Sequence, residues 1–434
     1  MIGNKEFRPA IDAINKTKIE SLEAIRKGDQ VMGNQYLRYP TIAELLHNHG
    51  RRTAVAGTKP VILLQDRAAR GNDALGADVF EGHALPEALN ATLAARLGPF
   101  PTVSKTSPQA DIWTEQALVG PLWGDSVPAF SVLWLSQPDY SQHFTGPGSP
   151  ASLAAIKSAD ENLARVLEAL DTKGVRQATD VIVVSDHGFS TIERKTDVQQ
   201  ALQQNGFRAM RDFSSHEPCE GDILVVGNGG SVFLYVTGHS PQLIEKVARF
   251  LQAQSFCGVL FTQLPVEGAF RLQDVRINSV GAPDIALSLR WKPDKNANGT
   301  PGLLCLDEGE NGPGQGTHGS LSPYDLHNTC VAAGPDFRRG FVDEFPSSNV
   351  DIAPTILWIL GVKPAQKQSG RVLTEALTPE AARGTAGHIT ATVNPHHLEA
   401  TYHGSEFLWR QYLNYSEYKG VVYFAEGNGD QERR

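Results

Sequence analysis

The chain has little cysteine, and none of it is clustered. Four cysteines occur in 434 residues, and they are widely spaced at Cys219, Cys257, Cys305 and Cys330. No C-x-x-C pair is present, which argues against a zinc knuckle and against a thioredoxin-like redox motif. We expect the four cysteines to be buried packing residues, with at most one disulfide among them.

The sequence also lacks the segments that mark membrane and nucleic-acid-binding proteins. No apolar run reaches the roughly 18 residues of a membrane span, and no basic-then-apolar signal segment follows Met1. A net charge of -9, a pI near 5.8 and the absence of a Lys/Arg block disfavour binding to a nucleic acid duplex. These absences predict a soluble protein that does not bind a nucleic acid duplex. They indicate neither oligomeric state nor compartment, although a signal peptide ahead of Met1 would make the protein periplasmic or secreted.

What is present is the alternation of strands and helices typical of an α/β fold. With 41% apolar and 20% charged residues, the chain can bury a large core, either as one domain with insertions or as two to three modules. Thr41 is expected to open a helix that Gly50 ends, just before a strand. Apolar periodicity predicts strands over 53–56, 129–135, 180–184 and 328–333, and helices over 84–98, 111–120, 150–172 and 351–360.

The middle of the chain changes character and predicts an inserted module. Short β-like runs and one helix over 241–254 fill residues 198–312, which suggests a smaller α+β unit. Its tail, residues 292–316, is rich in Gly, Pro, Asn and Asp and is expected to be an exposed loop. The expected organisation is therefore core (1–197), inserted module (198–312), core (313–375) and C-terminal extension (376–434), the last with a strand over 420–425 and a frayed polar end.

Three polar clusters lie beside the predicted strands. Pro138 to His143 (PDYSQH) follows one strand, Ser185 to Gly188 (SDHG) follows the next, and Gly316 to Gly319 (GTHG) precedes another. Parallel sheets bind their ligands in the loops at strand ends, so we expect all three clusters to be loops of one site.

The residue types in these clusters are those of a metal site. Carboxylate and imidazole ligands together suit Zn²⁺ or Mn²⁺ better than Mg²⁺ or Ca²⁺. Asp139, His143 and His318 could hold one ion, and the adjacent Asp186 and His187 could face a second. Two ions roughly 4 Å apart can clamp the attacking and leaving oxygens of a phosphoryl transfer. Each cluster alone is more often a helix cap or a surface turn, so the prediction rests on the three together.

These clusters resemble those of the alkaline phosphatase superfamily, and within it the type I phosphodiesterase/nucleotide pyrophosphatase family, with phosphonoacetate hydrolases as close relatives. The resemblance covers most of residues 1–375 and keeps the family's motif order. It is carried by the helix containing Asp160 and by PDYSQHFTGPGSP (138–150), DVIVVSDHGFS (180–190) and GTHGSLSPYDLHNTCVAAGPDF (316–337). It implies a three-layer αβα core with a mainly parallel sheet. It also implies two zinc ions, one on Asp139, His143 and His318 and the other on Asp186 and His187.

The chain departs from the family pattern at its start. In the family, the second ion also binds an Asp from the first core strand and the oxygen of a Thr or Ser nucleophile, both ahead of a His-Gly-hydrophobic-x-Asn turn. Residues Met1 to Asn4 resemble the end of that turn. We therefore assign no catalytic residue within the chain, and we favour a nucleophile encoded upstream over a natural pseudoenzyme.

The expected function is that of a metal-dependent hydrolase of phosphate esters, a zinc phosphodiesterase or nucleotide pyrophosphatase. The resemblance implies attack by the Thr or Ser oxygen on phosphorus, followed by hydrolysis of the phospho-enzyme. The alternatives are a phosphomonoesterase or phosphonoacetate hydrolase of the same superfamily, or a non-catalytic protein that binds a phosphate-bearing ligand. A sulfatase is less favoured, because sulfatases use carboxylate-rich calcium sites. Substrate choice is expected to come from the inserted module and from loops near Tyr140, Phe144 and Phe189.

Overall fold

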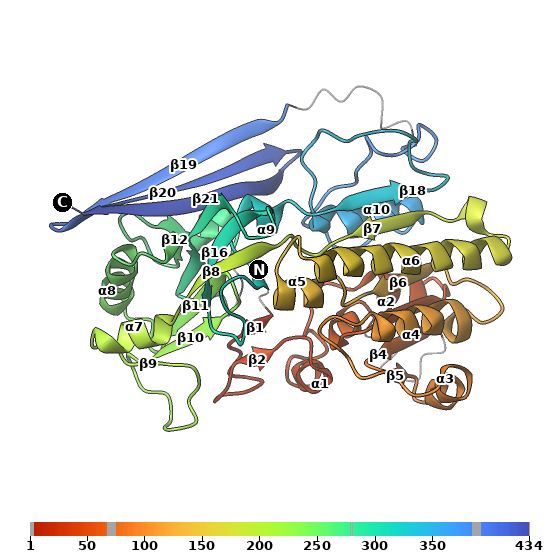
Figure 1. Ribbon diagram of the computed structural model, residues 1–434, viewed down its shortest axis with the longest axis horizontal. Helices are drawn as coiled ribbons and strands as arrows, with labels where there is room; N and C mark the ends of the chain where they lie inside the picture. The colour runs from red at the N-terminus through yellow and green to blue at the C-terminus, as the bar shows by residue number, and fades with distance from the viewer. Residues whose placement is uncertain (1–3, 67–74, 278, 280, 384–391, 434) are drawn as a thin grey trace.

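The computed structural model describes residues 4–66, 75–277, 279, 281–383 and 392–433, which form an α/β fold of several mixed sheets (Figure 1). One half of the molecule holds the N-terminal sheet and its covering helices, and the other half holds the inserted module and the C-terminal strands. The chain enters through a short ribbon made of β1 (Lys5–Glu6) and β2 (Thr17–Lys18).

The N-terminal sheet supplies the first part of the predicted core. Its strand order is β5-β4-β3-β6, and β3 pairs in parallel with both of its neighbours. A second, two-stranded piece pairs β7 with β18 antiparallel. The four predicted strands are present as β3 (Thr53–Gly57), β6 (Phe130–Trp134), β7 (Val181–Val184) and β18 (Cys330–Ala333). Two further strands, β4 (Gly76–Phe80) and β5 (His83–Leu85), were not predicted, and β5 lies at the start of the segment expected to be helical.

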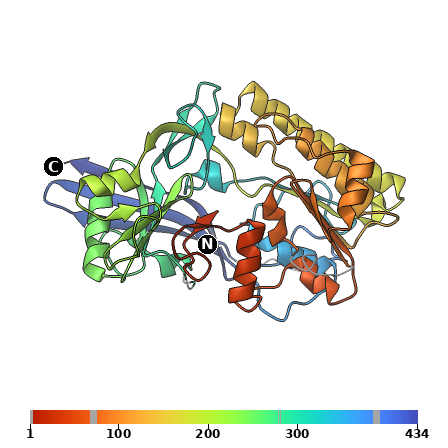
Figure 2. The same ribbon diagram turned by 90° about the horizontal axis from the view of Figure 1, so that it is seen from below.

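Helices cover both faces of this sheet, as a layered α/β core requires. On one face, Ala54 and Val79 of the sheet pack with Trp113 and Leu170. On the other face, Val55 packs with Ile25. Figure 2 shows the two helical layers with the sheet between them. The first layer holds α3 (Leu89–Leu97), α4 (Gln109–Ala117) and α6 (Pro150–Thr172), and the second holds α1 (Leu22–Val31), α2 (Ile42–His47) and α10 (Ile352–Ile359).

The helix boundaries follow the capping residues of the sequence. Thr41 and Glu44 form a reciprocal capping box at the start of α2, with bonds of 3.2 and 2.7 Å. Ser149 caps α6 by accepting a hydrogen bond from the backbone N–H of Ser152, and Pro150 occupies the first helical position. α6 therefore spans the predicted residues from end to end.

Strands β6 and β7 each have a free edge in the described part of the chain. β6 pairs only with β3, and β7 pairs only with β18. Val183 and its cross-strand partner Val331 are 39% and 59% exposed, which is unusual for apolar strands of an α/β core. The core sheet is thus interrupted between β6 and β7. These two strands lead into the first and second polar clusters, respectively.

The inserted module is built on a six-stranded sheet of order β13-β12-β14-β11-β10-β9. Val225, Leu234 and Leu287 of this sheet are fully buried against Ile244 and Leu251 of α8. Its elements are α7 (Val198–Gln204), β9 (Ala209–Met210), β10 (Ile223–Gly227), β11 (Ser231–Val236), α8 (Pro241–Gln252), β12 (Cys257–Thr262), β13 (Phe270–Arg271) and β14 (Ile285–Leu289).

The exposed loop expected over 292–316 is wrong where that segment forms strands. Residues Trp291–Lys295 (β15) and Pro301–Asp307 (β16) form a hairpin, and β16 pairs in parallel with β8 (Ser190–Thr196). Leu304 is fully buried. The Gly and Asn residues that suggested a loop lie largely in the turns, while the apolar residues within 301–307 pack into the module core.

The C-terminal extension forms a three-stranded antiparallel sheet that lies along the module (Figure 1). The side chain of Gln411 bonds both the N–H and the C=O of Leu260, at 2.7 and 3.1 Å, and Trp409 is fully buried. The frayed end expected beyond residue 425 is wrong, because pairing continues to the last described residue. The strands are β19 (Asn394–His403), β20 (Phe407–Tyr418) and β21 (Val421–Arg433).

All four cysteines are free thiols. Cys257 and Cys305 are buried as expected, whereas Cys219 and Cys330 are exposed, which the expectation of four packing residues did not anticipate.

Among the helices of the described residues, none combines the length and the apolar character that a bilayer crossing requires.

Candidate metal centre

The first polar cluster folds as a short helix, α5 (Asp139–Thr145), and not as the loop we expected. α5 follows β6 directly, so the sheet fixes its position. Residues four apart share a helix face, which brings Asp139 and His143 together. His143 Nε2 lies 3.3 Å from Asp139 Oδ1.

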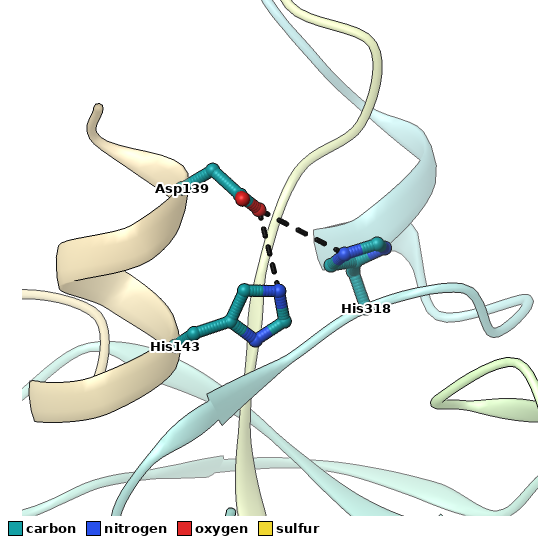
Figure 3. A group of neighbouring side chains, drawn as sticks. All are labelled: Asp139, His143 and His318. Carbon is teal, nitrogen blue, oxygen red and sulfur yellow. Dashed lines mark ion pairs between the residues drawn. The ribbon is translucent and has the colours of Figure 1, made fainter. Parts of the chain in front are cut away.

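His318 reaches the same point from the loop after β17 (Gly316–Thr317), which pairs with β8. Its Nε2 lies 3.8 Å from Asp139 Oδ1, and the ligand atoms of Asp139, His143 and His318 all lie within 4.8 Å of one another (Figure 3). The approach depends on Gly316, because a Cβ there would lie 2.4 Å from the carbonyl oxygen of Gln142 on α5.

The hydrogen bonds around this cluster leave its inner atoms free for a cation. His143 Nδ1 lies 3.0 Å from the Gly316 carbonyl oxygen, so Nδ1 carries the proton and the Nε2 lone pair faces Asp139. Asp139 Oδ1 is buried and makes no hydrogen bond to the described residues. A buried carboxylate oxygen without a donor is costly, and a metal ion would satisfy it. A metal-ligating histidine usually donates its other ring N–H to a backbone carbonyl or a carboxylate, which fixes the orientation of the ring.

The second polar cluster follows β7 and adjoins the first. His187 Nε2 lies 3.5 Å from Asp186 Oδ2 and 3.8 Å from Asp139 Oδ1. The His187 ring stacks on His318, with ring centroids 3.4 Å apart. Asp186 is the most open of the five, with its side chain 53% exposed. The structure therefore gathers all five candidate ligands in one region, with Asp186 and His187 beside the tighter cluster.

A comparison with protein-family models places these residues in a known family. The model for type I phosphodiesterase / nucleotide pyrophosphatase matches residues 17–268, more than half of the 434-residue chain. The chain belongs to this family.

Curated relatives of this phosphodiesterase family align with part of the chain. Mouse ectonucleotide pyrophosphatase/phosphodiesterase family member 3 is 20% identical over 273 residues, which are 62% of this chain and 29% of the mouse protein. The venom phosphodiesterase of Naja atra is 26% identical over 277 residues, 62% of this chain and 30% of the venom enzyme. The match thus covers less than a third of each relative's length.

Solved structures of the family show the same fold. Murine ectonucleotide pyrophosphatase / phosphodiesterase 5 superposes with a TM-score of 0.57 at 14% identity, covering 87% of this chain and 83% of the murine chain. An inactive form of the murine protein, solved in complex with AMP, gives the same score. At this identity the likeness establishes the alkaline phosphatase-like α/β fold alone.

An aromatic ring closes one side of the centre in this family member. Phe189 lies against the rings of His143, His187 and His318, with centroids 4.9, 5.4 and 5.2 Å away, and is 9% exposed. Phe189 thus lies beside the candidate ligands, and the role expected for its loop in substrate choice stays a prediction. Such a wall lowers the local dielectric and strengthens charge interactions at the centre.

A lysine that we did not predict as a site residue lies in the same cluster. Lys59 follows β3 and places its Nζ 2.5 Å from Asp139 Oδ2. Burial alone would raise the pKa of Asp139, but the ammonium group of Lys59 holds it well below its usual range. Burial, aided by the neighbouring His187, holds the pKa of His318 well below its usual value. The sequence could have indicated Lys59, because this residue closely follows a predicted strand. That strand, β3, pairs in parallel with β6, so both strands end at the same edge of the sheet, near Asp139.

Asp325 is a second residue that sequence reasoning missed. It is almost fully buried and accepts hydrogen bonds from Ser190 Oγ (2.6 Å), Ser320 Oγ (2.6 Å) and the Ser320 backbone N–H (3.0 Å). Burial raises its pKa, against the effect of these hydrogen bonds. The carboxylate thereby ties the start of β8, just after the Asp186–His187 pair, to the loop that carries His318. Only the fold could have revealed the link to β8, because Ser190 lies far from Asp325 in the sequence.

Proposed function

We propose that the chain forms the metal-binding body of a zinc-dependent phosphodiesterase or nucleotide pyrophosphatase. The observation that carries the proposal is the convergence of Asp139, His143 and His318 on a buried Asp139 oxygen that accepts no hydrogen bond from the described residues. Membership of the phosphodiesterase family and the names of the relatives support the same reaction class.

In this proposal, Asp139, His143 and His318 hold one zinc ion, and Asp186 and His187 contribute to a second, with Mn²⁺ as the alternative metal. The donor set of carboxylate and imidazole suits these metals. When bound, two such ions supply Lewis acidity that neutralises charge on the phosphoryl oxygens. The chain's own residues orient the substrate, and Phe189 keeps water from one side of the centre.

The nucleophile, in the same proposal, is the hydroxyl of a Thr or Ser on a strand ahead of residue 1. The free edges of β6 and β7 support this idea, because a parallel strand between them would end beside Asp139 and His187. Backbone groups at both edges would then be paired, as in a continuous sheet. The relative solved with AMP suggests a nucleotide ester or diphosphate as substrate.

The test uses bis(para-nitrophenyl) phosphate hydrolysis by the 434-residue chain and by a form extended ahead of residue 1 from its gene. The extended form should lose activity on metal removal and recover it with zinc. The shorter chain should be at least about 1,000-fold slower, since loss of a nucleophile usually costs this much or more. Equal turnover by the two forms contradicts the upstream nucleophile, and activity without metal in either form contradicts the metal-dependent function.

A further inference from the structure

The C-terminal sheet has one covered edge and one open edge. At the covered edge, β21 meets the inserted module: the Gly427 N–H donates to the Leu321 carbonyl at 2.9 Å, and the Gly427 carbonyl accepts from Trp291 Nε1 at 2.8 Å. At the other edge, β19 is the outermost strand (Figure 1) and pairs only with β20 among the described residues. Within that part of the chain, the backbone groups on the outer side of β19 therefore face no other strand.

β19 has almost none of the features that protect a free edge. Natural edge strands avoid pairing through short length, bulges, lysines or prolines. β19 runs for ten residues, against a usual strand length of about 5–6. Its register with β20 continues from Asn394 to His403 without a bulge. The strand contains neither Lys nor Arg, and its single proline, Pro395, lies near its start. Such an edge is suited to pairing with another strand.

The exposed face of β19 carries a fixed pair of opposite charges, His397 and Glu399. Their side chains are 53% and 74% exposed, and His397 Nε2 lies 3.1 Å from Glu399 Oε1. His397 Nδ1 lies 2.6 Å from Asn414 Oδ1, and the Asn414 amide N–H donates to Glu426, which orients the amide. With an acceptor at each ring nitrogen, both nitrogens donate and the ring is a cation. Asn414 and Glu399 accordingly raise the pKa of His397.

We propose that β19 pairs antiparallel with β19 of a second copy of this chain, with the two Leu398 residues opposite each other on a two-fold axis. In this register, His397 of each copy lies directly opposite Glu399 of the other copy, so the axis creates two complementary pairs. The two three-stranded sheets then form one continuous sheet. This inference does not depend on the proposed function.

The charge pattern selects this register among its neighbours. Moving the axis one residue forward sets Glu399 against Glu399, and moving it one residue back sets His397 against His397. Like charges directly opposite each other destabilise a strand pair. One added pair of strands makes a small interface, so we expect the dimer to dissociate reversibly.

The experiment is sedimentation velocity of the 434-residue chain at about pH 6, where a histidine with a raised pKa carries its charge. The wild type should pass from monomer to dimer over about 1–100 µM, a range suited to a small interface. His397→Glu and Glu399→Lys each place like charges opposite one another twice. Each should raise the dissociation constant of the dimer at least about tenfold.

Mixing the two variants separates docking from damage to the strand. In a mixed dimer, the introduced glutamate of one chain faces the introduced lysine of the other, and the native His397 faces the native Glu399. The mixture should therefore form dimers at wild-type concentrations, although the residues within each chain remain mismatched.

Glu432→Lys is the matched control, because Glu432 is an exposed glutamate of the same sheet on β21, with β20 between it and β19. It should dimerise as the wild type does. A wild type that stays monomeric at the highest concentration overturns the proposal. So does a dimer that neither substitution weakens, or a mixture of the two variants that stays monomeric.

Discussion

At the scale of single residues, main-chain carbonyls decide which ring nitrogen of His143 and of His187 faces the centre. His143 is fixed by Gly316 and His187 by the Gly188 carbonyl, with Nδ1···O distances of 3.0 and 2.9 Å. Both Nε2 atoms thus point toward Asp139. The spacing of the motifs predicted which residues to consider, but these carbonyl partners come from tight backbone approaches that only the folded chain provides.

The buried carboxylate of Asp325 gives a prediction at this scale. Asp325→Asn replaces one acceptor oxygen with an NH₂ group, so a hydroxyl or backbone N–H of Ser190 or Ser320 loses its acceptor. We expect the free energy of unfolding to fall by about 1–3 kcal/mol and zinc affinity to fall as the His318 loop loosens. Urea denaturation and zinc titration measure the two effects. Ser190→Ala, which removes a single donor, should cost less, and an Asn variant as stable as wild type would contradict this role.

At the scale of elements, the helix α5 and the hairpin β15–β16 show what pattern reasoning missed. Asp139 and His143 were assigned to a loop because PDYSQH is polar, yet the four-residue spacing is helical and puts both on one face. The hairpin was hidden by the Gly and Asn residues of its turns. Longer elements such as α6 were predictable, because their apolar period repeats over many turns and their caps are clear.

The far end of β7 carries a partly buried carboxyl group, Asp180, with a raised pKa. Asp180 begins the segment leading into β7 and accepts a hydrogen bond from the backbone N–H of Asp336 at 3.1 Å. Burial, together with the nearby Asp336 carboxyl, raises the pKa of Asp180 to about 6. Because this folded-state pKa lies above the unfolded value, the folded state binds more protons, and stability falls as pH rises from about 4 to about 6.

Asp180→Asn should remove this dependence. We expect its urea midpoint to decline less than that of the wild type between pH 4 and pH 6.5, because the amide has no proton to release. The same titration of Asp171→Asn provides the control, since Asp171 is exposed at the end of α6. Parallel midpoint curves for the wild type and Asp180→Asn would show that another group controls stability in this range.

At the scale of the whole molecule, the fold class and the region of the candidate site were predictable, whereas the arrangement of the sheets was not. The order of strands and polar clusters predicted an α/β core, and the family match and the solved relatives confirm that class. The division of the core sheet between β6 and β7, and the packing of the C-terminal strands on the module, depend on contacts between distant segments. Asp325 enters the site only through such a contact, with Ser190.

The most direct test of the account is the zinc content of the purified chain after incubation with zinc and dialysis, measured by plasma mass spectrometry. His239→Ala is the control, because His239 is an exposed histidine of the inserted module that pairs with Asp284. The wild type and this control should each retain about two ions per chain. Asp139→Asn combined with His318→Ala should lose at least one of them while keeping its circular dichroism spectrum. A folded wild-type chain that retains no metal, or a double variant that retains as much as the wild type, would contradict the assignment of this centre.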